Sequence, residues 1–179
     1  MKTIIRIPDV PVSALDVFRM LPEGTRAEVI NNVLYMSPSP IFNHQKLVST
    51  LFLKLGNHIE EKALGELIVS PFDVYLDEYI SAVQPDLLFI ARRNKGILKE
   101  DGYAHGAPDL IIEILSNNET RDRTLKKSLY EKAGVKEYFI VAPETKEVIS
   151  YYHTGKKYEK GAAQKGKIVS RMLKRTFKF

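Results

Sequence analysis

Two acidic residues stand where apolar strands are expected, and such a carboxylate pair can hold a divalent cation. Glu113 lies inside the run Leu110-Ile-Ile-Glu-Ile-Leu115, and Asp86 begins the run that ends at Ala91. A carboxylate in such a run is costly unless it is paired or binds a cation, although a strand whose one polar residue faces solvent would give the same pattern. Carboxylates on adjacent strands can converge on one Mg²⁺ or Mn²⁺, because these ions prefer oxygen ligands and retain waters for chemistry.

A lysine downstream of Glu113 is the third residue that could take part in chemistry. Asp122, Lys126 and Tyr130 recur at four-residue spacing and therefore share one face of a helix. From that face Lys126 could orient an attacking water or neutralise charge that builds on a phosphate. The spacing alone favours the alternative of a solvated helix with an Asp–Lys pair, worth only about 0.3–0.5 kcal/mol.

Cap and turn residues define the helices that would carry or flank these positions. Helices are expected over residues 13–20, 44–63 and 122–133. Ser13 and Asp16 have capping-box spacing at the start of the first helix. Gly65 and Gly134 are placed to end the second and third helices.

The strand pattern predicts a mixed sheet. Strands are expected at residues 27–36 (as a hairpin), 67–76, 83–91, 110–115, 137–142 and 148–153, with short strands in the lysine-rich C-terminal segment. Asn31-Asn32 supplies the turn of the N-terminal hairpin. The order predicts an α/β (mixed α+β) fold with a central mixed sheet flanked by helices, an N-terminal hairpin and C-terminal strands. No repeat or linker divides the chain, so we expect one domain over residues 1–179.

Composition excludes several classes of protein. The chain has 179 residues, is 44% hydrophobic and 27% charged, and contains no cysteine. A folded core is therefore expected, whereas disulfides, thiolate zinc sites and cysteine nucleophiles are excluded. No segment approaches the roughly 20 apolar residues that cross a bilayer. Prolines and charges interrupt the first twenty residues before they could form a signal peptide, so we expect a cytoplasmic protein without a membrane partner.

Positive charge is concentrated at the C-terminal end. The net charge is +5, but residues 154–179 hold nine Lys or Arg against one acid, a local excess of +8. A basic end on a slightly acidic body is typical of a phosphate-binding surface beside a carboxylate site. A solvated pair of strands that aids solubility would look the same, and the sequence does not decide between them.

Taken together, the polar positions resemble the Uma2 family of restriction-type endonucleases (DUF820), in the PD-(D/E)XK nuclease superfamily. The matching segments are Pro85-Asp86-Leu87, Ala107-Pro-Asp-Leu-Ile-Ile-Glu-Ile-Leu-Ser116, Asp122-x-x-x-Lys126-x-x-x-Tyr130-x-x-x-Gly134-Val-x-Glu-Tyr138 and, upstream, Glu28-Val-Ile-Asn-Asn, Met36-Ser-Pro38 and His44. The resemblance covers residues from about 13 to 179. It implies a restriction-endonuclease-like fold around the central sheet.

The resemblance also implies roles for the central residues. Asp86 and Glu113 would be the metal-binding carboxylates, with Mg²⁺ or Mn²⁺ as the cofactor. Lys126 would take the role of the superfamily lysine, because the usual position for it, two residues after Glu113, is Leu115 in this chain. A lysine supplied from the following helix would compensate for that departure.

Two upstream residues complete the expected site. Glu28 and His44 match polar positions of the family and would tune the site. A water-facing strand residue and a helix-start residue are the respective alternatives. Asp122 would support Lys126 rather than touch metal, and Tyr130 is expected to be a packing residue with a polar tip. Asn31-Asn32 replaces the glycine usual in the first hairpin, and Asn tolerates the left-handed conformation needed there.

The function expected from these residues is metal-dependent hydrolysis of phosphodiester bonds, in DNA. A catalytically weak nucleic-acid-binding module with the same fold is the second hypothesis, and Leu115 favours it. An interaction protein whose carboxylates hold a structural ion is the third. A homodimer is expected if both strands are cut, because that requires two centres.

Overall fold

The computed structural model describes residues 11–77, 80–116 and 121–179, without the side chains of Arg121 and Asp122. Its helical segments are α1 (Ala14–Arg19), α2 (Phe42–Glu61), a 3₁₀ helix (Arg92–Ile97), a π-helical turn (Arg121–Lys126) and α3 (Lys127–Ala133). Its strands are β1 (Ala27–Ile30), β2 (Val33–Met36), β3 (Gly65–Val69), β4 (Val74–Asp77), β5 (Ser81–Val83), β6 (Leu87–Ala91), β7 (Ala104–His105), β8 (Leu110–Ile114), β9 (Glu137–Val141), β10 (Glu147–His153), β11 (Tyr158–Lys160), β12 (Gln164–Lys165), β13 (Lys167–Ser170) and β14 (Arg175–Lys178). None of the helices in these ranges combines the length and the apolar character needed to cross a bilayer.

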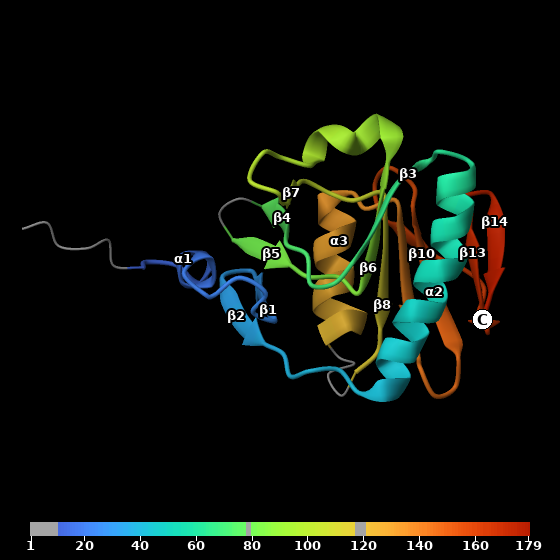
Figure 1. Cartoon of the computed structure of the whole chain (residues 1–179), viewed down its shortest axis with the longest axis horizontal. Coiled ribbons are helices and arrows are strands. Elements are labelled where there is room, and N and C mark those ends of the chain that lie inside the picture. The colour runs from blue at the N-terminus through green and yellow to red at the C-terminus, as the bar shows by residue number, and fades with distance from the viewer. Residues whose placement is uncertain (1–10, 78–79, 117–120) are drawn as a thin grey trace, which may run out of the picture.

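The central sheet is mixed and is covered on both faces (Figure 1). Its strand order is β11-β10-β9-β8-β6-β3, with β12 also paired to β10. β8 and β9 run parallel, whereas β6 is antiparallel to both β3 and β8. A second sheet has the order β2-β1-β5-β4-β7, and β13 and β14 form a separate hairpin. The mixed α+β class predicted from the sequence is confirmed.

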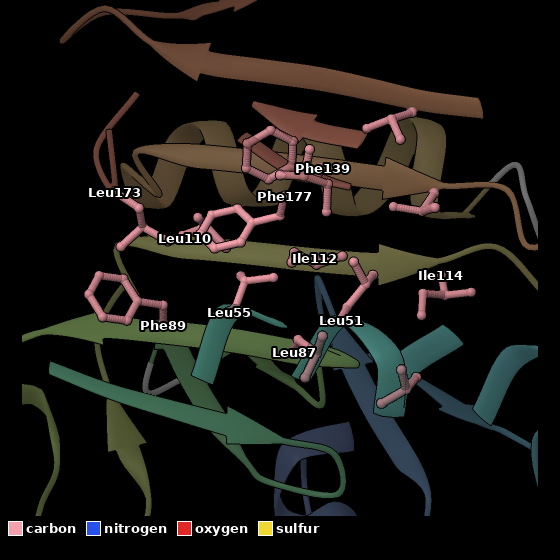
Figure 2. Close-up of a cluster of buried hydrophobic side chains, with 14 of the residues drawn as sticks. Leu51, Leu55, Leu87, Phe89, Leu110, Ile112, Ile114, Phe139, Leu173 and Phe177 are labelled. Atoms are coloured by element: carbon pink, nitrogen blue, oxygen red, sulfur yellow. The ribbon is translucent and has the colours of Figure 1, made fainter. Parts of the chain in front are cut away.

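Alternate residues of the central strands bury against different helices. One face packs against α2 and the β13–β14 hairpin, and Figure 2 shows Leu51 and Leu55 of α2 beside the side chains of β6 and β8. The other face packs against α3 and the second sheet, through residues such as Ile111 and Leu115. Glu113 lies midway between Ile111 and Leu115, and residues two apart on a strand point to the same face, so its side chain is directed to the α3 face.

Two strands predicted as continuous are each divided between the two sheets, so those predictions were wrong. The segment 67–76 becomes β3 in the central sheet and β4 in the second sheet, with Pro71 between them. The segment 83–91 becomes β5 and β6, with Pro85 between them. Proline has no N–H for a ladder hydrogen bond, so each strand pairing stops there and the chain crosses to the other sheet. Asp86 consequently lies at a crossing point.

Three predictions that depend only on neighbouring residues, one capping box, one hairpin turn and one helix end, are confirmed. Ser13 and Asp16 form a reciprocal capping box at the start of α1. Asn31 and Asn32 form the two-residue turn between β1 and β2 with φ of 51° and 60°. Gly134 ends α3 in the left-handed conformation with φ of 85°.

Gly65 does not end the long helix, contrary to the prediction. Helix α2 ends at Glu61, and Gly65 is the first residue of β3. A Cβ atom at Gly65 would collide with the carbonyl oxygen of Ile90 and lie 2.9 Å from the Cα of Ala91. This glycine therefore permits the close approach of β3 to β6.

We expect Gly65→Ala to lower the free energy of unfolding by about 1–3 kcal/mol, because the backbone of β6 must move to admit the methyl group. Gly96→Ala is the matched control, since a Cβ there would meet no atom within 4 Å. Urea denaturation of the two variants measures the difference. Equal stability of both variants would contradict the close-approach explanation.

Candidate active site

The five residues to which the sequence analysis gave a catalytic or metal-binding role line one cavity. Its volume is 380 Å³, and it opens between the β1 hairpin, the start of α2, the end of β8 and the π-helical turn. The five residues that come together there are Glu28, His44, Asp86, Glu113 and Lys126. All five are buried, with exposed fractions between 3% and 8%. The alternatives of solvent-facing residues for Glu113, Lys126 and Glu28 are therefore wrong.

Lys126 joins two carboxylates from different sheets. Its Nζ lies 2.8 Å from Glu28 Oε1 and 2.8 Å from Glu113 Oε1. Glu28 comes from β1 of the second sheet, and Glu113 comes from β8 of the central sheet. Lys126 ends the π-helical turn that precedes α3, over the face of the sheet to which Glu113 is directed. Such turns recur at functional sites, and this one brings the ammonium group to both acids.

Leu115 and Lys126 both lie at the face of the central sheet to which Glu113 is directed. Leu115 lies two residues after Glu113 and so shares its face of the sheet, where it is 4% exposed within the core against α3. A lysine at that position would reach the same face. Lys126 approaches that face from the helical layer above it, and its ammonium group donates a hydrogen bond of 2.8 Å to Glu113 Oε1.

Tyr130 supports Glu113 from the same helical layer. Its hydroxyl donates a hydrogen bond of 2.7 Å to Glu113 Oε1, the oxygen that also accepts from Lys126. Burial, together with the nearby charge of Glu113, holds the pKa of Tyr130 well above its usual value, so the hydroxyl remains a donor. The packing role predicted for Tyr130 is therefore joined by a positioning one. The side chain of Asp122 lies outside the described residues.

Asp86 is held by a backbone amide and a histidine. The amide N–H of Ile114 donates 2.8 Å to Asp86 Oδ2, and His44 Nε2 lies 3.2 Å from the same oxygen. His44 Nε2 is also 3.1 Å from the Ile114 carbonyl oxygen, so this nitrogen carries the hydrogen. Burial by itself lowers the pKa of His44, but its contacts with Asp86 and the Ile114 carbonyl raise it overall.

Two further residues of the cavity were missed in the sequence. Arg26 lines the cavity, and its guanidinium group makes no hydrogen bond or ion pair within the described ranges; its Nε is buried. Its position two residues before Glu28, on the same side of an extended chain, was the available signal. The backbone N–H of Gln84 donates 3.0 Å to Glu28 Oε1. No local pattern indicated this contact, because it joins segments that only the fold brings together.

The donor set fits a hard divalent cation. Asp86 Oδ1 has no hydrogen-bond partner in the described part of the chain, and Asp86 and Glu113 both line the cavity. Across residues 11–77, 80–116 and 121–179, no three His, Asp or Glu side chains converge as a ready-made metal cage. Mg²⁺ does not need such a cage, because it is usually bound through one or two carboxylates and keeps several waters.

Two other features noted in the sequence lie apart from the cavity. Asp109 of the second Pro-Asp pair accepts hydrogen bonds from the Ala91 amide and from the Asn94 side chain. It therefore holds the 3₁₀ helix against the end of β6. The basic segment 154–179 contributes no residue to the cavity lining. Its β13–β14 hairpin packs against the α2 face of the central sheet instead. Any phosphate contact from this segment is made outside the cavity.

Comparison with known proteins agrees with the sequence resemblance. The Uma2 family model, described as "Putative restriction endonuclease", matches residues 15–174. A solved structure described as a "putative nuclease belonging to DUF820" from Anabaena variabilis ATCC 29413 has a TM-score of 0.67 over 84% of this chain and 84% of that chain. The two sequences are 17% identical, so this likeness shows the fold alone. No curated protein matches the chain.

Proposed function

The chain belongs to the Uma2 family, and on that premise we propose that it is a metal-dependent endonuclease that hydrolyses phosphodiester bonds in DNA. The observation that supports this most strongly is the buried Lys126 bridging Glu28 and Glu113 beside Asp86, in a cavity open to a ligand. Burying four ionisable groups together is costly for stability, so such a cluster favours a functional role.

Asp86 and Glu113 would hold Mg²⁺ or Mn²⁺. When bound, the ion would lower the pKa of a water molecule and polarise the phosphate. The Ile114 amide and His44 fix the orientation of Asp86 Oδ2 and leave Oδ1 open. Tyr130 and Lys126 both contact Glu113 Oε1 and so fix the second carboxylate.

The cationic side chains have complementary roles in this proposal. Lys126 is placed to orient the attacking water or to stabilise negative charge on the phosphate. Arg26 has a planar guanidinium group without a protein partner in the described ranges, and this geometry suits two parallel hydrogen bonds to phosphate oxygens. Glu28 holds Lys126 in place and in turn accepts from the Gln84 amide. Cutting both strands of a duplex would require two such centres, so we expect a two-fold dimer.

One observation favours a second candidate function. Leu115 occupies the strand position where the superfamily lysine is usual, and it is buried among apolar neighbours. If Lys126 does not substitute for that lysine, the chain would be a nucleic-acid-binding module with weak or no cleavage.

Cleavage of supercoiled plasmid separates the two functions. With Mg²⁺ or Mn²⁺ we expect nicked and linear products, and with EDTA we expect none, because the water and phosphate lose their activation. Agarose gels measure the products, and a mobility shift in EDTA measures binding. Binding with no cleavage in either metal would support the binding module and contradict the nuclease proposal.

A further inference from the structure

A second cavity, which we call the aromatic pocket, lies beside the candidate active site. Its volume is 650 Å³, and it opens between α1 with the turn that follows it, the start of β4 and the segment before β7. Four aromatic side chains line it: Phe18, Phe72, Tyr75 and Tyr103. None of the residues expected to act in catalysis belongs to this lining.

The rings form one connected wall. Tyr75 is buried, stacks on His105 with centroids 4.8 Å apart, and meets Phe18 and Tyr103 edge-on. Phe72 lies 6.5 Å from Tyr103 at a tilt of 53°. Phe72 and Tyr103 are only partly buried, so ring surface remains available to a flat ligand. Nucleic acid bases stack on aromatic side chains of this kind in proteins that bind single strands.

Three carboxylates line the pocket, and Asp73 is the one that Gln84 contacts. Asp73 accepts 2.8 Å from Gln84 Nε2 through Oδ1, and its Oδ2 has no partner among the described residues. Burial raises the pKa of Asp73, although the Gln84 amide opposes that shift. Glu23 and Asp101 also line the pocket, the latter 2.8 Å from His105 Nε2, and Arg19 is the one Lys or Arg among the described lining residues. This excess of carboxylates disfavours a phosphate group and favours a ligand edge that carries N–H donors.

Gln84 connects the pocket to the candidate active site. Its backbone N–H donates to Glu28 Oε1, whereas its side chain donates to Asp73 Oδ1 and to the Thr25 carbonyl oxygen. Gln84 lines both cavities, and Thr25 of the pocket directly precedes Arg26 of the active-site cavity. A nucleic acid strand with a phosphate at the active site can therefore direct a neighbouring base to the aromatic pocket.

We propose that the aromatic pocket binds one unpaired base of the substrate strand, guanine in preference to the others. Guanine presents two adjacent donors, N1–H and N2–H, to the carboxylate of Asp73. Adenine and cytosine each present an acceptor beside their amino group, which the carboxylate repels. The base stacks on Tyr103 and Phe72. This inference rests on the proposed function, because it takes the ligand to be part of a nucleic acid substrate.

The test measures binding without cleavage. Oligothymidylate of about 20 nucleotides and the same strand with one central guanine are titrated with the protein in EDTA, with fluorescence anisotropy as the readout. We expect the guanine strand to bind at least about fivefold more tightly, the lower end of the discrimination that one bidentate hydrogen-bond pair gives against the wrong base. Tyr103→Leu and Asp73→Asn should both abolish that preference, whereas Tyr103→Phe should keep it. Asp77→Asn, the same charge change at an exposed position on β4, is the control.

Asp73→Asn keeps the oxygen that accepts from Gln84, so this variant should keep the pocket folded while it loses the carboxylate. Equal binding of the two strands by the wild type, or no binding of either, overturns the proposal. A guanine preference that survives Asp73→Asn overturns it as well, whatever the folding of Tyr103→Leu. Plasmid cleavage by the same preparations, with Mg²⁺ added, reports the proposed nuclease function separately.

Discussion

Replacing Glu113 by Gln, or Asp86 by Asn, is expected to reduce the rate of plasmid cleavage at least about 100-fold, since even residues that only support metal ligands contribute about 10–100-fold. Each substitution keeps the shape of the side chain and removes the charge that would hold the cation. Glu113→Gln can still accept from Tyr130, and Asp86→Asn can still accept from the Ile114 amide. The rate of nicking under excess protein measures the effect.

Glu144→Gln is the matched control for these two variants. Glu144 lines the same cavity but is exposed, and its Oε1 accepts 3.0 Å from Asn43. We expect its cleavage rate to stay within about twofold of the wild type, as surface substitutions usually change free energies by less than 0.5 kcal/mol. If Glu113→Gln and Asp86→Asn cut as fast as Glu144→Gln, the assigned carboxylates are not the reactive centre.

Replacing Lys126 by Met is expected to lower the free energy of unfolding by about 3–5 kcal/mol, the usual result of removing one partner from a buried ion pair. The ammonium group is the direct partner of both Glu28 and Glu113, and its side chain is only 4% exposed. Methionine fills a similar volume, so the loss would report the stranded carboxylates rather than a void. Urea denaturation at neutral pH measures it.

Lys127→Met tests whether the loss of stability in Lys126→Met arises from the burial of its ion pairs. The neighbouring lysine pairs with Glu131 at 3.0 Å, but its side chain is 30% exposed. A pair open to solvent contributes at most about 1 kcal/mol, so this variant should lose little stability. The double variant Lys126→Met with Glu113→Gln should recover part of the loss, because one stranded charge is removed. Equal losses in the two lysine variants would refute the buried-bridge interpretation.

The sequence by itself determined the features that depend on short-range geometry. The capping box of Ser13, the Asn31-Asn32 turn and the left-handed end of α3 at Gly134 each need only a few neighbouring residues. The apolar run around Glu113 marked this carboxylate as a candidate for a buried, paired position, and the structure decided against the solvent-facing alternative. The family resemblance added Glu28 and His44, which no local pattern could connect to Glu113.

Only the tertiary structure decided how those residues meet. The crossing of the chain between sheets at Pro71 and Pro85 was hidden, because an apolar run shows burial but not the sheet in which it pairs. The contact of Lys126 with both Glu28 and Glu113 depends on the register of β8 and on the π-helical turn above it. Gln84, which joins the active-site cavity to the aromatic pocket, gave no signal at all. Periodicity gives the face on which a side chain lies, whereas long-range strand pairing decides what stands opposite that face.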